Sequence, residues 1–226
     1  MIDKEKTEDW YKRPAELGAW INDKIREGAR VLEIGPGLSP FFRATHFLDA
    51  YFDQGYARTD LLGGGVHVSC NVDVETIPFP DKYFDFVFSS HVLEDLRYPL
   101  RACAEMSRVA KAGFSTTPSP LVEFCRGAQS VWRGHLHHHW FVYPSNGVLQ
   151  FLNKNVSVEY ASFPQEETLE QIILTSPWLA HSYYYWEGEM KTAEVNVPRY
   201  GDYPGLVMEA IKEGMLSTKN FLAGIV

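Results

Sequence analysis

The stretch Val31-Leu32-Glu33-Ile34-Gly35-Pro36-Gly37 decides the fold of this 226-residue chain. Four mostly apolar residues stop at a Gly-Pro-Gly sequence, which is the pattern of a buried strand that enters a tight loop. Glycine lets the backbone approach a ligand closely at the end of such a strand. A short glycine pattern alone fits a plain tight turn as well as a nucleotide-like ligand, so the neighbouring segments must decide.

Short apolar runs recur along the chain and predict further strands. They cover residues 44–48 (ending at Asp49), 66–72, 84–89 and 114–117. Helical patterns cover residues 8–26 and 99–111, with Gly113 expected to end the second helix. Short strands that alternate with helices predict an α/β fold with a Rossmann-like, doubly wound, mostly parallel sheet. Beyond residue 120 we expect helices at 165–174 and 204–216 and a strand within 182–195.

The composition excludes several classes of protein. Hydrophobic residues make up 45% and charged residues 22%, as in an ordinary globular protein. The net charge of -8 disfavours nucleic acid as a partner. Cys70, Cys103 and Cys125 are too few and too widely spaced for a disulfide framework, so we expect buried free thiols. No apolar stretch is long enough to cross a membrane, and the charged N-terminus is not a signal peptide, so a cytoplasmic location is expected.

The organisation predicted is one domain over residues 1–226. A cofactor-binding half occupies about residues 1–120, and an acceptor-side half with many aromatic residues occupies about 121–226. The sequence leaves the oligomeric state open.

Four segments in the first half resemble the class I S-adenosylmethionine-dependent methyltransferases. They are LEIGPG at 32–37, DVETIPF at 73–79, FDFVFSSHVLEDL at 84–96 and EMSRVAKAG at 105–113. The resemblance covers roughly residues 30–120. It implies a seven-stranded sheet with an antiparallel C-terminal strand, and S-adenosylmethionine lying across the carboxyl ends of the strands, with S-adenosylhomocysteine as the product.

The resemblance also implies roles for individual residues. Gly35, Pro36 and Gly37 form the loop beneath the methionine and ribose portions, and Glu33 shapes that loop or meets the amino group. Asp49 holds the ribose hydroxyls. The remaining cofactor positions are Asp73 at the adenine amino group, Val74 beside the ring, and Ser90 and His91 at the methionine end.

The chain departs from the family pattern at two places. Only 14 positions separate Gly35 from Asp49, so the helix after the loop must be short or replaced by a turn at residues 38–42. This turn resembles that of a short-loop subgroup. The glycine pair expected before strand five is reduced to Ala112-Gly113. An NAD-linked dehydrogenase would need a third glycine at position 40, where this chain has Pro40.

The histidines are the candidate catalytic groups. A hydroxyl acceptor benefits from a general base, and His139, His135 and His91 are the candidates, although His91 lies in a turn that more often lines the cofactor pocket. The cluster at residues 135–139 has three interpretations: an exposed loop without chemistry, a source of one base, or a divalent-metal site. The metal interpretation is the less favoured, because no Asp or Glu lies within the cluster and its spacing lacks a helical i, i+4 pair.

The acceptor is specified only by analogy. Trp132, Trp140, Trp178 and Trp186 either stack a small molecule or form the core of the second half. Similarity to the short-loop subgroup favours O-methylation of a sugar or glycan hydroxyl. The alternatives are a non-sugar metabolite acceptor and a cofactor-binding scaffold without turnover.

Overall fold

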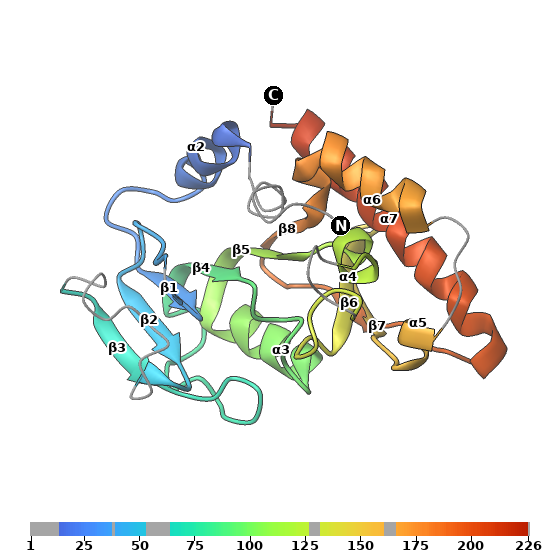
Figure 1. The fold of residues 1–226 in the computed structure, drawn as a ribbon. Coiled ribbons are helices and arrows are strands. Elements are labelled where there is room, and N and C mark those ends of the chain that lie inside the picture. The colour runs from blue at the N-terminus through green and yellow to red at the C-terminus, as the bar shows by residue number, and fades with distance from the viewer. Residues whose placement is uncertain (1–13, 38, 53–63, 127–131, 161–165, 226) are drawn as a thin grey trace.

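The main sheet has six strands in the order β3-β2-β1-β4-β5-β8 (Figure 1). A computed structural model describes residues 14–37, 39–52, 64–126, 132–160 and 166–225. The strands are β1 (Val31–Ile34), β2 (His46–Asp49), β3 (Val66–Ser69), β4 (Phe84–Ser90), β5 (Ala110–Pro118) and β8 (His181–Glu187). All neighbours are parallel except β8, which is antiparallel to β5. The predicted Rossmann-like, mostly parallel sheet with an antiparallel C-terminal strand is therefore confirmed, and the described residues contribute six of the seven strands expected.

A second, three-stranded sheet was not predicted. It has the order β6-β7-β9 and is built from β6 (Trp140–Ser145), β7 (Val148–Asn153) and β9 (Thr192–Glu194). The β6–β7 hairpin turns at Asn146 and Gly147, which have φ of 50° and 76°. The expected strand within 182–195 is thus two strands, β8 and β9, which belong to different sheets.

Most of the predicted helices are present. The helices in the described ranges are α2 (Ala15–Asp23), α3 (Pro99–Val109), α4 (Pro120–Phe124), α5 (Ser157–Tyr160), α6 (Glu166–Thr175) and α7 (Tyr203–Ala223), with 3-10 turns η4 (Pro177–Ala180) and η5 (Tyr200–Asp202). The first part of the helix predicted at 8–26, residues 8–13, lies outside the described residues. Gly113 does not end α3. The backbone is already extended at Ala110, and Gly113 pairs with Val87 and Trp186 inside β5.

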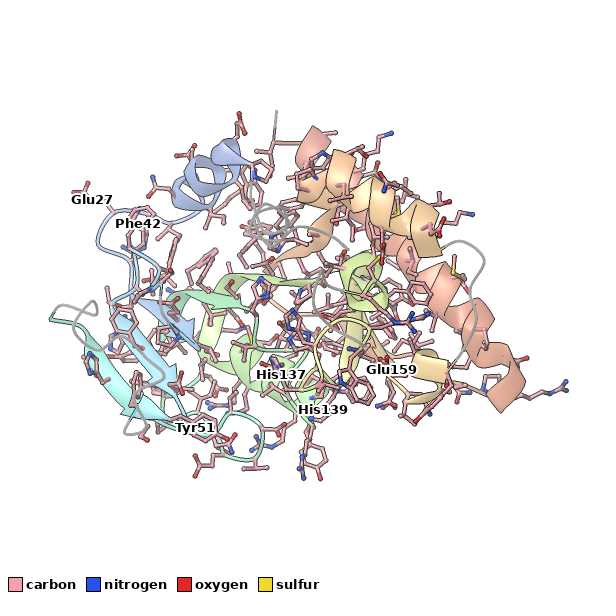
Figure 2. All side chains as sticks on the ribbon, viewed as in Figure 1. Glu27, Phe42, Tyr51, His137, His139 and Glu159 are labelled. Atoms are coloured by element: carbon pink, nitrogen blue, oxygen red, sulfur yellow. The ribbon has the colours of Figure 1, made fainter. Side chains whose placement is uncertain are left out.

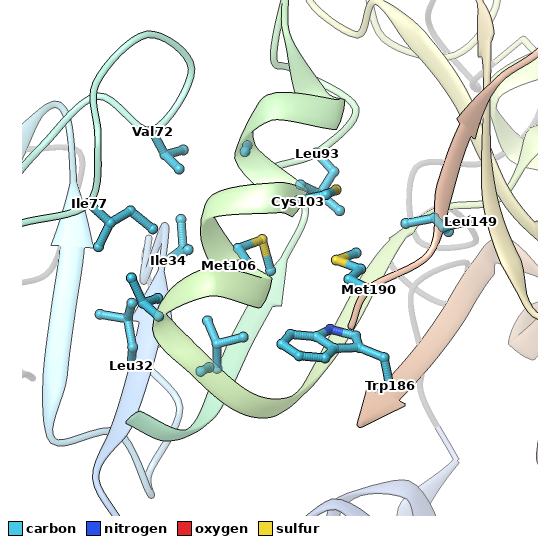
Figure 3. Close-up of a cluster of buried hydrophobic side chains, with 14 of the residues drawn as sticks. Leu32, Ile34, Val72, Ile77, Leu93, Cys103, Met106, Leu149, Trp186 and Met190 are labelled. Atoms are coloured by element: carbon cyan, nitrogen blue, oxygen red, sulfur yellow. The ribbon is translucent and has the colours of Figure 1, made fainter. Parts of the chain in front are cut away.

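Alternate side chains along the sheet face opposite layers. Leu32, Val87 and Trp186 pack on one face with α3, in a cluster that also includes Leu149 and Met190 from the second half (Figure 3). On the other face, Phe86, Phe114 and Tyr183 pack against α2 and the C-terminal end of α7. One buried core cluster therefore spans both halves of the predicted domain.

Three further expectations concern burial. All three cysteines are free and buried, as predicted. Trp140 and Trp186 are buried in the core, which was one of the two interpretations of the second-half aromatics. Within the ranges that the structure describes, no helix is long and apolar enough to cross a membrane.

Candidate active site

The loop after β1 is shaped by a close contact with the turn after β4. Gly35 has a φ of +68°, and a Cβ added there would lie 2.5 Å from Cγ2 of Val92. The Gly35 N–H donates to the Leu48 carbonyl at 2.9 Å, which joins the loop to β2. Only glycine combines the left-handed backbone with this approach. The loop therefore brings the carboxyl ends of β1, β2 and β4 together.

Glu33 fixes the far side of the same loop. Its side chain is buried, and Oε2 accepts the N–H of Phe41 at 2.8 Å. Burial raises the pKa of Glu33 to about 7, opposed by the Phe41 hydrogen bond. Glu33 and Pro36 do not line the cavity beside the loop. These contacts favour the loop-shaping role for Glu33 over direct contact with a ligand.

A cavity of about 810 Å³ opens at the carboxyl ends of the parallel strands. Such a volume holds a ligand of nucleoside size, and parallel sheets bind ligands at this edge. Gly35, Gly37, Asp49, Asp73 and His91, which the sequence offers as cofactor residues, all line it. Asp49 ends β2, and its Oδ1 accepts the Tyr51 N–H at 2.7 Å.

Asp73 also has a structural task. Its Oδ1 accepts the N–H of Tyr98 at 2.6 Å, and its Oδ2 accepts the N–H of Arg97 at 3.1 Å. These bonds fasten the segment after β3 to the start of α3. Val74 is 57% exposed and does not line the cavity, whereas Val72 does. Sequence reasoning missed Val72 as a cavity residue. Its place at the end of the apolar run 66–72 is the signal that could have found it.

A second cavity, of about 780 Å³, lies beside the first. One wall is aromatic: Phe41 stacks on Phe88 at 4.3 Å, and Phe42, 73% exposed, meets Phe41 edge to face at 5.2 Å. The other wall is imidazole-rich and includes Ser90, which lines this cavity and not the first. The tryptophans of the second half line neither cavity.

The two cavities share three lining residues: His91, Asp95 and His137. In Figure 2, His137 lies toward the middle of the molecule, while Phe42 and Tyr51 lie on the side of β1–β3. Phe42 lines the second cavity and Tyr51 the first. A group bound in one cavity therefore meets a group bound in the other at these shared residues.

His91 occupies a strained position at this junction. Its φ is 56°, a backbone conformation that non-glycine residues rarely adopt, and its N–H donates to the Thr116 carbonyl at 2.9 Å. The Nδ1 atom lies 3.5 Å from Oε1 of the buried Glu94. A carboxylate on that side favours the tautomer in which Nε2 accepts a proton.

The segment of residues 135–139, called here the histidine loop, contributes His135, His137 and His138. One ring nitrogen from each of these lies within 4.8 Å of the others. All three side chains line the second cavity. Burial lowers the pKa of His135 and His137 below the usual value of an imidazole. His139 is exposed and lines neither cavity; its backbone N–H donates to the Glu94 carbonyl at 2.7 Å. Of the two leading candidates, the structure brings His135 to the cavity and leaves His139 outside.

Sequence reasoning missed the carboxylates around this loop. Asp95 Oδ1 lies 3.4 Å from His138 Nε2, and Glu123 Oε1 lies 2.6 Å from His138 Nδ1. Burial and the nearby Glu94 raise the pKa of Asp95 to about 7. Burial acts to lower the pKa of His138, but Glu123 outweighs it and the net shift is upward. These acids lie far from the histidines in sequence, so only the fold reveals the grouping.

A family model described as a methyltransferase domain matches residues 45–114. The chain is 32% identical over 153 residues to the ubiquinone/menaquinone biosynthesis C-methyltransferase UbiE of Bordetella avium, covering 62% of this chain and 56% of that protein. It is 31% identical over 173 residues to the enzyme of the same name from Ralstonia nicotianae, covering 66% of this chain and 67% of that protein. The chain thus spans little more than half the length of the Bordetella relative.

Solved structures also show similarity. A crystal structure of an S-adenosylmethionine-dependent methyltransferase from Aquifex aeolicus is 20% identical, with a TM-score of 0.38 and coverage of 53% of this chain and 75% of that one. A likeness at this level carries no conclusion about activity.

Proposed function

Because this chain belongs to the class I S-adenosylmethionine-dependent methyltransferases, we propose that it methylates a small acceptor that carries a hydroxylated planar ring. The single observation behind the proposal is that the two cavities share His91, Asp95 and His137. The first cavity suits the cofactor and the second the acceptor, so the shared residues surround the point of transfer.

The residues of the first cavity fit S-adenosylmethionine. Gly35 lines this cavity without a side chain, and the Asp49 carboxylate ends β2 where ribose hydroxyls need an acceptor. The sulfonium of this cofactor supplies a methyl group that is already activated, so the protein mainly aligns the acceptor with it. We infer the predicted cofactor roles for Gly35, Gly37 and Asp49 on this basis. For Asp73 the two backbone bonds support a structural role beside any ligand contact.

The second cavity supports an acceptor with a ring. Phe41, Phe42 and Phe88 offer a surface on which a planar ring packs. His91 lines the same cavity at its junction with the first, and with Nδ1 near Glu94 its Nε2 is suited to take a proton from a ring hydroxyl. Glu94 would stabilise the protonated imidazole. A deprotonated phenol is nucleophilic at its oxygen and at the ring carbons ortho and para to it, so this arrangement serves either C- or O-methylation.

The relatives favour carbon as the methylated atom. Their names describe C-methylation in quinone biosynthesis. The sugar hydroxyl favoured by sequence analogy gains no support from them. We therefore place C-methylation of a phenolic or quinol-like ring first and keep sugar O-methylation as a second arm of the test.

The test is transfer of a labelled methyl group from S-adenosylmethionine to a panel of phenols, hydroquinones and monosaccharides. NMR of the product separates a carbon-bound from an oxygen-bound methyl group. We expect a methylated ring, and a kcat lowered about 10²–10⁴-fold in His91→Gln. Because His91 also lines the cofactor cavity, kcat is measured at saturating S-adenosylmethionine. The exposed His67 provides the matched control, His67→Gln. Methylated sugars alone would overturn the ring acceptor, and cofactor binding without turnover on any acceptor would support a scaffold.

A further inference from the structure

We propose that His135, His137 and His138, together with Asp95, bind one divalent transition-metal ion of the zinc class at the junction of the two cavities. Binding of the ion does not depend on the proposed function, whereas its use in methyl transfer rests on it. The sequence disfavoured a metal because no acid lies within the histidine run. The fold supplies that acid from the turn after β4.

The distances suit a small four-coordinate ion. The three imidazole ligand atoms lie within 4.8 Å of one another. Asp95 Oδ1 lies 3.4 Å from His138 Nε2 and 3.8 Å from His137 Nε2. Bonds of about 2.0–2.1 Å in a tetrahedral site separate neighbouring ligand atoms by about 3.4 Å. Asp95 and His138 therefore already have this spacing. His137, at 3.8 Å from Asp95, and the imidazole nitrogens, within 4.8 Å of one another, would draw closer around a bound ion.

Hydrogen bonds hold the histidine loop in a conformation in which the imidazole nitrogens point toward the cavity they line. Nδ1 of His138 faces Oε1 of the buried Glu123 at 2.6 Å, which leaves Nε2 to bind a metal. Lys154 Nζ donates to Glu123 Oε2 at 2.9 Å and to the His135 carbonyl at 2.8 Å. A Cβ at Gly134 would lie 2.3 Å from Glu123 Oε2, so glycine is needed for the loop to pack this closely.

The local charge also calls for a cation. Glu94 is fully buried, and neither of its carboxylate oxygens has a hydrogen-bond partner among the described residues. Oδ1 of Asp95 is likewise buried without such a partner in that part of the chain. Lys154 is already held by Glu123. The only cationic groups near these oxygens are imidazoles, of His91 at Glu94 and of His137 and His138 at Asp95 in the described part of the chain. Buried carboxylates that lack hydrogen bonds are costly, and a dication at the histidines would offset that cost.

The ligand set indicates the kind of ion and its use. Imidazole nitrogens suit zinc and its transition-metal neighbours, whereas magnesium and calcium prefer oxygen ligands. All four residues line the acceptor cavity. An acceptor oxygen that enters this cavity can therefore bind the ion and be held beside His91.

The experiment uses the full chain without a histidine tag, stripped of metal and titrated with Zn²⁺ or Mg²⁺ by calorimetry. We expect one Zn²⁺ per chain, no comparable Mg²⁺ binding, and tetrahedral Co²⁺ absorption on cobalt loading. His137→Ala and Asp95→Asn should each weaken Zn²⁺ binding at least about 10-fold. The exposed His139, next to the cluster, gives the control His139→Ala, which should bind as the wild type does. Thermal melts in EDTA check that the variants fold.

Three results would overturn the site. They are no stoichiometric Zn²⁺ binding, equal weakening in His139→Ala and His137→Ala, and preference for Mg²⁺ over Zn²⁺. Methyl transfer is then measured with and without Zn²⁺. Zinc binding with metal-independent transfer would overturn only the role in acceptor binding. Zinc binding without any transfer would count against the proposed function and leave the metal site standing.

Discussion

Replacing Glu33 with glutamine should remove a pH dependence from the stability of the fold. Glu33 is 2% exposed, and burial raises its pKa from 4.5 to about 7. Between pH 4.5 and about pH 7 the folded protein holds a proton on Glu33 that the unfolded chain has lost. Stability from this group is therefore present at low pH and is lost as the pH rises from 4.5 toward 7.

The raised pKa of Glu33 corresponds to a decrease of about 2–3 kcal/mol in the free energy of unfolding between pH 5 and pH 8. For a chain of this size that corresponds to roughly 5–10 °C in Tm. Glutamine keeps an oxygen to accept the Phe41 N–H but carries no charge, so Glu33→Gln should not lose this contribution.

Urea or thermal unfolding at several pH values measures the effect as the difference in slope between wild type and Glu33→Gln. The exposed Glu16 in α2 provides the control Glu16→Gln, which should follow the wild type. Parallel stability curves for wild type and Glu33→Gln would refute the assignment of a buried proton to Glu33.

Three further substitutions test the geometry of the site. Gly35→Ala should destabilise the fold by about 2–4 kcal/mol, more than Gly28→Ala, because both glycines have a φ of +68° but only Gly35 would clash with Val92; equal losses by urea unfolding would contradict the clash. Asp73→Ala should cost about 1–3 kcal/mol by freeing two backbone N–H groups, and unchanged stability would remove its structural role. Phe42→Ala should raise the acceptor KM several-fold with little change in Tm, and an unchanged KM would place the acceptor elsewhere.

The sequence predicted the cofactor half better than the other half. Strands β1 and β4 are short apolar runs bounded by glycine or serine, and a buried parallel strand leaves that pattern directly in the residues. The Gly35 loop and Asp49 could be placed because strand order alone brings their ends together.

The β6–β7 hairpin had a local signal that was missed. Asn146-Gly147 stands between two apolar runs, the strongest short-range mark of a hairpin. The expected stop at Gly113 failed for a different reason, because its backbone is needed inside β5.

The acceptor side could not be predicted from local pattern. Asp95 and Glu123 meet His138 only because β4, α4 and the histidine loop converge in three dimensions. The aromatic wall comes from Phe41, Phe42 and Phe88 in the first half. Of the two interpretations of the second-half tryptophans, Trp140 and Trp186 follow the core one, and none of the four lines either cavity.

Calorimetric titration of S-adenosylmethionine into the wild type and Asp49→Ala tests the cofactor site most directly. We expect one cofactor per chain, bound about 10- to 100-fold more weakly by Asp49→Ala, because the ribose hydroxyls lose a charged acceptor worth about 1.5–3 kcal/mol. The exposed Asp23 gives the control Asp23→Ala, which should bind normally. No binding by the wild type, or equal affinity in Asp49→Ala, would contradict a cofactor held across the ends of β1 and β2.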